Sequence, residues 1–277
     1  MTNVLRLAAF SKNGQGGNPA GVAFYDSMPS AEEMMSIAKE VGYSETAFLV
    51  KQDDGWRVRY FAPELEVPFC GHATIALGAA LGERFGEGQY KLFLNDSQIT
   101  VRAEKSANGM SSTLQSPETK SEDAPKDFVG KVLAGFHLDS NQLDPNFPIR
   151  FAGAGARHLI IFVKERATLA NMKYEFEPVR ALMMAEGLIT ISLLWNESDS
   201  VFHSRNAFAS GGVYEDPATG AAAAALGGYL RDIQWQGAKT FTILQGEDMG
   251  VPSRLTVSFT PKIGESVVVS GEVRHIE

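Results

Sequence analysis

The chain has 277 residues, a net charge of −8 and one cysteine. Its hydrophobic fraction of 44% and charged fraction of 21% are typical of a soluble globular protein with one large domain or two of ordinary size. The acidic balance argues against nucleic acid as a partner, because phosphate binding needs a basic face.

Cell location follows from the same composition. A single cysteine allows no internal disulfide, which fits a reducing cytosol. The first residues lack a basic region followed by an apolar stretch, so no secretory signal is expected. No apolar run approaches the length of a membrane span. We therefore expect a cytoplasmic protein with no membrane partner.

The first hundred residues predict strands around a few helices. A loop rich in glycine and asparagine, 12–19, separates the first two strands. Ser30 and Glu33 form a predicted capping box, and the helix after them ends near Gly42. The strands expected here are 5–10, 20–25, 46–51, 56–61, 90–94 and 98–103.

A change of composition marks the middle of the chain. Residues 104–127 begin with a turn and then collect Pro, Ser, Glu, Lys and Asp, which predicts a linker. The order of the first half then repeats, with a further helix opening at Gly220. The other elements expected after the linker are helices 128–135 and 178–185 and strands 149–151, 158–163, 189–195, 240–244, 255–259, 267–269 and 273–275.

Two glycine-opened helices carry the strongest signal. The segments starting at Gly71 and Gly220 align with each other, so that Gly78 meets Gly227. A glycine turn at a helix start presents free backbone N–H groups and the positive end of a helix dipole, which favours an anion. The alternative is that small-residue helices need glycine only for a tight turn and close packing. The shared spacing, with a strand-like run before each (58–61 and 212–214), favours a duplicated fold whose two helix N-termini face one small anionic ligand.

The chemistry-bearing residues near these turns have two interpretations each. Glu45 stands where a helix gives way to an apolar strand, so it is either a general base or a surface glutamate at a strand end. His72 is either catalytic or structural. Asp216 either caps a turn or orients a reacting group. Cys70 is either a reactive thiol or a small buried hydrophobe.

No cofactor is expected. Cys70 and His72 lack a second ligand pair nearby in the sequence, so no metal site is predicted. The glycine-rich segment 13–17 lacks the strand–turn–helix context of a dinucleotide site, and no phosphate-binding lysine motif occurs.

Together the motifs resemble those of the PhzF-like phenazine biosynthesis isomerase family, and the match extends over the whole chain. The segments that carry the resemblance are Gly17-Asn18-Pro19-Ala20, Ser44-Glu45-Thr46-Ala47-Phe48, Cys70-Gly71-His72-Ala73-Thr74, Arg157-His158-Leu159, Glu215-Asp216-Pro217-Ala218-Thr219-Gly220, Gln245-Gly246 and Gly250-Val251-Pro252-Ser253.

The resemblance implies the fold. It is an α/β (α+β) fold of the diaminopimelate-epimerase type, with two pseudo-symmetric domains, each a mixed β-sheet wrapped around a central helix. The expected domains are 1–115 with 262–277, and 116–261. The family also implies a homodimer and a cofactor-independent isomerase with its active site in the cleft between the domains.

The resemblance further implies roles for individual residues. Glu45 resembles the family's catalytic acid/base, with His72 and Asp216 as polar partners. Its substrate-binding positions correspond here to Ser44, Gly71, His72, Ala73, Thr219, Gly220 and Ala221. The family often has serine where this chain has Ala221, so one hydroxyl contact is missing and the substrate need not be the phenazine precursor.

We therefore predict an isomerase that moves a proton within a small carboxylate-bearing molecule, with Glu45 as the single acid/base. The first alternative is an amino-acid racemase or epimerase using Cys70 and Glu45. Related racemases have a second cysteine where this chain has Pro217, which cannot transfer protons. The second alternative is a non-catalytic protein that binds small carboxylates.

Overall fold

The computed structural model describes residues 4–276 and divides into two compact units. The first comprises the chain up to Gln115 together with the residues from Ser270 onward, and the second comprises Ser116–Val269. Residues 262–269, which the sequence interpretation joined to the first domain, lie in the second unit. Among the described residues, no helix is long and apolar enough to cross a membrane.

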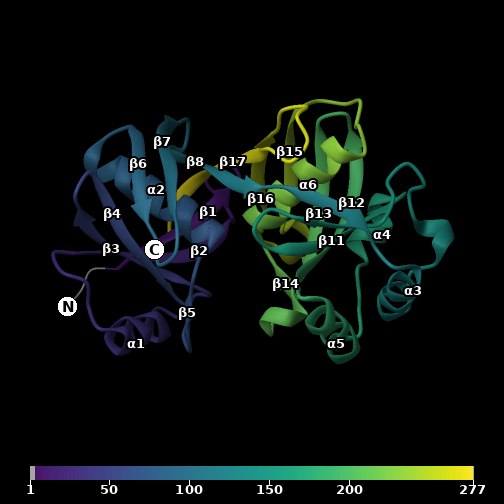
Figure 1. The fold of residues 1–277 in the computed structure, drawn as a ribbon, viewed down its shortest axis with the longest axis horizontal. Helices are drawn as coiled ribbons and strands as arrows, with labels where there is room; N and C mark the ends of the chain where they lie inside the picture. Colours follow the sequence, from purple (N-terminus) through teal and green to yellow (C-terminus); the bar gives the residue numbers. More distant parts are fainter. Residues whose placement is uncertain (1–3, 277) are drawn as a thin grey trace. The chain divides into compact units, whose positions relative to one another are not determined.

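The first unit is a mixed sheet around one helix (Figure 1). The central helix, α2, contacts strands β1, β2, β3, β6 and β7, whereas α1 packs on β3 and β4. The elements are β1 (Leu5–Ser11), β2 (Asn18–Tyr25), α1 (Ala31–Val41), β3 (Thr46–Gln52), β4 (Gly55–Phe61), β5 (Glu66–Val67), α2 (Gly71–Phe85), β6 (Gly88–Phe93), β7 (Gln98–Ser106) and β8 (Gly109–Glu118).

The second unit repeats this plan around α6 (Gly220–Asp232). Its other elements are β9 (Lys120–Asp123), α3 (Lys126–Gly135), η1 (Ser140–Gln142), β10 (Arg150–Gly153), β11 (Arg157–Val163), α4 (Arg166–Ala170), α5 (Phe176–Glu186), β12 (Leu188–Ser198), β13 (Val201–Ala207), η2 (Ala209–Gly211), β14 (Glu215–Asp216), β15 (Thr240–Gln245), η3 (Glu247–Met249) and β16 (Ser253–Ser258). Strand β17 (Ser266–His275) begins in the second unit and continues into the first from Ser270 onward.

Strand pairing shows the duplication directly. In the first unit β1 is antiparallel to β2, β2 parallel to β3, β3 antiparallel to β4, β4 parallel to β6 and β6 antiparallel to β7. The second unit has the same succession in β10, β11, β12, β13, β15 and β16. The helices α1 and α5 also end alike, at the left-handed glycines Gly42 and Gly187. The fold class expected from the family resemblance is confirmed.

Three expectations about local structure were wrong. The predicted linker 104–127 contains a long strand, β8, because its polar residues alternate with buried Met110, Ser112 and Leu114. The run 212–214, expected to be strand-like, is not a strand. In addition, strand β13 was not predicted at all. The two final strands are one continuous strand, β17.

Each central helix is buried on nearly all sides. In α2 every residue from His72 to Gly82 is buried, and in α6 the same holds from Ala222 to Arg231. A helix that is buried all round can only be enclosed closely where its side chains are small. At Gly227 an added Cβ would lie 2.8 Å from a methyl carbon of Val267 and 3.1 Å from one of Val257.

This packing predicts that Gly227→Ala destabilises the second unit by about 1–3 kcal/mol, because overpacking outweighs the gain in helix propensity. The matched control is Gly130→Ala in α3, where an added Cβ meets nothing within 4 Å; it should stabilise by up to about 1 kcal/mol. Urea unfolding of both variants measures the difference. Equal stabilisation by the two alanines would contradict the packing argument.

His158 is a fully buried histidine of the second unit. It is fully enclosed on β11, and its Nδ1 lies 2.8 Å from Thr190 Oγ1 on β12. Its Nε2 has no hydrogen-bond partner among the described residues. Burial lowers the pKa of His158 from 6.5 to about 4, so the folded protein keeps this imidazole neutral.

Acid should therefore destabilise the fold through His158. Its depressed pKa contributes stability that is present above pH 6.5 and is lost as the pH falls toward 4, since only the unfolded chain binds the proton easily. Between pH 7 and pH 5 the loss is about 2 kcal/mol. Comparing denaturant unfolding at both pH values, His158→Asn should lose most of this pH dependence, whereas His137→Asn, at an exposed site, should keep it.

Candidate active site

Glu45 is held where α1 gives way to β3. Ser30 caps the start of α1 through the N–H of Glu33, and Gly42 ends the helix in the left-handed conformation. The backbone carbonyl of Glu45 accepts a hydrogen bond from the Gly21 N–H at 3.1 Å. This bond fixes the main chain of Glu45 beside β2, so the direction of its side chain is set by the sheet.

Cys70 and His72 are placed by the start of α2. Cys70 is the N-cap residue, and its carbonyl accepts hydrogen bonds from the Thr74 N–H at 3.0 Å and the Thr74 hydroxyl at 2.7 Å. Thr74 in turn lies 2.7 Å from the hydroxyl of Tyr60, whose pKa is raised by burial. Hydrogen bonds from Thr74 and Tyr60 therefore hold the turn at Cys70 in place.

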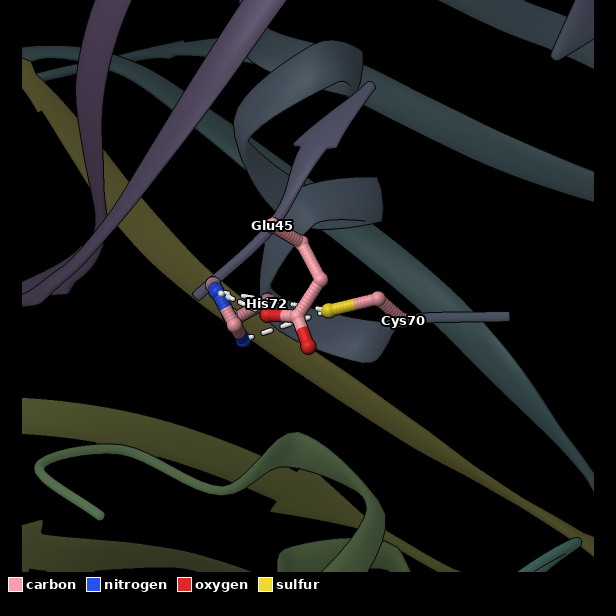
Figure 2. Close-up of side chains that lie close together, drawn as sticks. All are labelled: Glu45, Cys70 and His72. Carbon is pink, nitrogen blue, oxygen red and sulfur yellow. Dashed lines mark hydrogen bonds and ion pairs between the residues drawn. The ribbon is translucent and has the colours of Figure 1, made fainter. Parts of the chain in front are cut away.

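The side chains of Glu45, Cys70 and His72 converge (Figure 2). His72 Nε2 lies 3.4 Å from Glu45 Oε2 and 3.3 Å from Ser44 Oγ, and His72 Nδ1 lies 3.3 Å from Cys70 Sγ. The Glu45 and His72 side chains are 19% and 10% exposed. Imidazole thus bridges a carboxylate and a thiol in a partly shielded position, an arrangement suited to moving protons.

One carboxylate oxygen of this cluster accepts no hydrogen bond within the described part of the chain. Glu45 Oε2 is buried and accepts no hydrogen bond from any residue that the structure describes. A buried carboxylate oxygen without a hydrogen-bond donor raises the free energy of the folded protein unless another group binds to it. This oxygen is therefore the atom of the site that is ready to take a proton or another electrophile.

The remaining predicted site residues lie on two turns. Gly71 and Ala73 are in the first turn of α2, together with His72. Asp216, Thr219, Gly220 and Ala221 lie around the start of α6, in the second unit. Neither Cys70 nor Thr219 makes a side-chain cap hydrogen bond, so the leading N–H groups of both helices are not used by their own cap residue.

Gln245 supports the turn before α6, and the sequence analysis gave it no role. Its amide donates to the Asp216 carbonyl at 2.7 Å and to Thr219 Oγ1 at 3.2 Å, and its oxygen accepts from the Thr219 N–H at 3.3 Å. Thr219 Oγ1 also donates to the Asp216 carboxylate. The signal that could have indicated Gln245 is its place at a strand end before Gly246, which has a φ of 73°.

Gln245→Leu should destabilise the second unit by roughly 1–3 kcal/mol, because partly buried backbone N–H and C=O groups lose their partner. The matched control is Gln236→Leu, since Gln236 bonds only an exposed carbonyl two residues away, and it should change stability by less than about 0.5 kcal/mol. Urea unfolding of both variants tests this. Equal effects would show that Gln245 does not hold the turn.

That Glu45 lies beside Cys70 and His72 was also not foreseen from the sequence. From the sequence, Cys70 and His72 had no further ligand. In the fold, Glu45 joins them: a carboxylate oxygen of Glu45, the sulfur of Cys70 and a ring nitrogen of His72 all lie within 4.8 Å of one another. These three residues are the ones among 4–276 grouped closely enough to hold a metal ion.

Comparison with known proteins decides the family. The model of the family described as "Phenazine biosynthesis-like protein" matches residues 7–275. The chain belongs to this family. "Uncharacterized isomerase YddE" of Escherichia coli O157:H7 is 30% identical over 237 residues, covering 82% of this chain and 78% of the relative. "Uncharacterized isomerase PA3578" of Pseudomonas aeruginosa is 31% identical over 221 residues, covering 80% and 78%. The chain is thereby placed among the isomerases of this family.

Solved structures agree in fold. A PhzF-family phenazine biosynthesis protein from Bacillus anthracis has a TM-score of 0.87 at 25% identity, covering 100% of this chain and 97% of its own. A probable proline racemase from Agrobacterium radiobacter has a TM-score of 0.68 at 11% identity, covering 100% and 91%. The second likeness concerns the fold alone.

Proposed function

We propose that the protein is an isomerase that moves a proton within a small carboxylate-bearing molecule, with Glu45 as the single acid/base. The observation that carries the proposal is the buried, unbonded Oε2 of Glu45 beside His72. A general base needs an accessible lone pair at hydrogen-bond reach of the proton it removes. Glu45 Oε2 accepts no hydrogen bond from the described residues, although His72 Nε2 faces it at 3.4 Å, and the oxygen is buried, so a substrate reaches it only when the groups that cover it move.

His72 is the group that couples Glu45 to its surroundings. Its Nε2 faces both Glu45 and Ser44, and its Nδ1 faces Cys70. An imidazole in that position can donate a hydrogen bond to the carboxylate while Glu45 is ionised, or lend a proton to a substrate atom. We assign it to positioning Glu45 and to polarising the substrate.

The substrate carboxylate is assigned to helix N-termini. The first turn of α2, with Gly71 and Ala73, and the first turn of α6, with Gly220 and Ala221, each begin without a side-chain cap. Such termini favour an anion through N–H donors and the helix dipole. On this proposal each turn can hold a substrate carboxylate, and Asp216 and Thr219 shape the turn at the start of α6.

The distance between Glu45 and Cys70 gives less support to the racemase alternative. Two bases that exchange protons on opposite faces of a carbon need about 3 Å each to that carbon, so they are roughly 6–7 Å apart. The reactive atoms of Glu45 and Cys70 lie within 4.8 Å. That spacing favours two groups acting on the same side over two groups flanking a carbon.

The proposal is tested by solvent deuterium exchange into small cyclic and unsaturated carboxylic acids. In deuterated buffer the protein should label any acid it isomerises, which a binding protein without catalysis would not do. Glu45→Gln should lower the exchange rate by at least ~10²-fold, because the amide cannot take a proton. Glu40→Gln, at an exposed position of α1, is the matched control and should leave the rate unchanged.

Cys70→Ala separates the mechanisms. Under the single-glutamate mechanism it should cost much less than Glu45→Gln, because the thiol only adjoins His72. A loss as large as that of Glu45→Gln, with both variants folded by circular dichroism, would replace the single-base mechanism with thiol–carboxylate racemisation. Exchange that survives in Glu45→Gln at the wild-type rate would remove Glu45 from the mechanism.

A further inference from the structure

The cluster of Glu45, Cys70 and His72 combines three kinds of metal ligand in one place (Figure 2). We propose that these three side chains bind one Zn²⁺ ion and that the bound ion inhibits the enzyme by occupying Glu45 Oε2. The inhibition rests on the proposed role of Glu45 as the base, whereas the binding does not.

The ligand chemistry fits zinc. Thiolate, imidazole and carboxylate are the groups that hold Zn²⁺ in proteins, and a thiolate disfavours the hard ions Mg²⁺ and Ca²⁺. In a tetrahedral centre with bonds of about 2.0–2.3 Å, neighbouring ligand atoms are roughly 3.3–3.6 Å apart. His72 Nε2 lies 3.4 Å from Glu45 Oε2 and 4.0 Å from Cys70 Sγ. The nitrogen and oxygen thus already have the required separation, and the sulfur has to come closer.

Burial and support favour the same site. Cys70 and His72 are each 9% exposed, and both are fixed by the start of α2. Glu45 is fixed by its backbone bond to Gly21. Glu45 Oε2 accepts no hydrogen bond from the described residues and faces His72 Nε2 at 3.4 Å, so an ion at this position would give this oxygen a direct bond. Three ligands on two anchored segments need little reordering, which lowers the entropic cost of binding.

Two features limit the affinity. Three protein ligands leave the fourth zinc position to water or another small ligand. The positive end of the α2 dipole disfavours a cation, although the thiolate and the carboxylate together carry two negative charges. We therefore expect reversible binding, weaker than at a closed structural site with four protein ligands, which suits an inhibitory ion.

A second histidine between carboxylates provides the matched control. His203 Nε2 lies 2.5 Å from Glu197 Oε2, and its Nδ1 lies 3.3 Å from Glu247 Oε2. This group contains no cysteine, because Cys70 is the one cysteine of the sequence, so it cannot give a thiolate-to-metal band. His203→Asn should therefore leave zinc affinity at the Cys70 cluster unchanged.

The test uses Co²⁺ as a spectroscopic substitute for Zn²⁺ on the full chain. Since Cys70 is the one cysteine in the sequence, a thiolate-to-cobalt charge-transfer band can arise only there. We expect the band to saturate at one Co²⁺ per chain and to disappear when Zn²⁺ is added. Cys70→Ser should abolish the band, and His72→Asn should weaken Zn²⁺ binding at least tenfold, whereas His203→Asn should do neither.

The absence of a saturable thiolate band in the folded wild-type protein would overturn the zinc site, whatever the variants do. Zinc that binds there without slowing deuterium exchange would overturn the inhibition. These results are separable from the proposed function. If the metal-free protein exchanges deuterium but binds no Co²⁺ at Cys70, only the zinc site is rejected. A protein that shows the band but never catalyses exchange retains the zinc site and loses the isomerase mechanism.

Discussion

Close enclosure of a small-residue helix is the constraint on which each unit depends. Strands can surround α2 and α6 only because glycine and alanine let backbone and side chains approach, as at Gly78, where an added Cβ would lie 2.1 Å from Ser112 Oγ. Enclosure leaves few places where such a helix meets other chemistry. Its first turn is one of them, and the cluster of Glu45, Cys70 and His72 gathers there.

The duplication is one of architecture and not of chemistry. In the first unit the segment after the Gly42 cap brings Glu45 to His72. Glu45 lies three residues after the Gly42 cap, and Thr190 lies three residues after the corresponding Gly187 cap, where it bonds the enclosed His158. One half therefore has an ionisable residue after this glycine cap, paired with a histidine of its helix turn, whereas the other has a threonine paired with a buried histidine of the neighbouring strand. This difference is consistent with a single acid/base.

Much of the fold was predictable, because glycine and apolar periodicity act locally. The starts of α2 and α6 at Gly71 and Gly220 follow from the sequence. Strand β13 was missed because its buried side chains include histidine, arginine and asparagine, although the duplication required a counterpart to β4. The family motifs indicated Glu45 and His72, but their contact with Cys70 depends on three-dimensional packing. Gln245 stood in a family motif, but its hydrogen bonds to the turn before α6 join residues far apart in the sequence and depend on packing.

The order of the chain has a consequence for biosynthesis. Strand β1 pairs with β17, Leu7 opposite His275, so one edge of β1 is covered by a strand from far later in the chain. The second unit, from Ser116 to Val269, is synthesised before that pairing can form. An uncovered strand edge is a template for pairing with another chain. During translation the nascent first unit therefore carries an open edge, and chaperone protection is most needed before β17 leaves the ribosome.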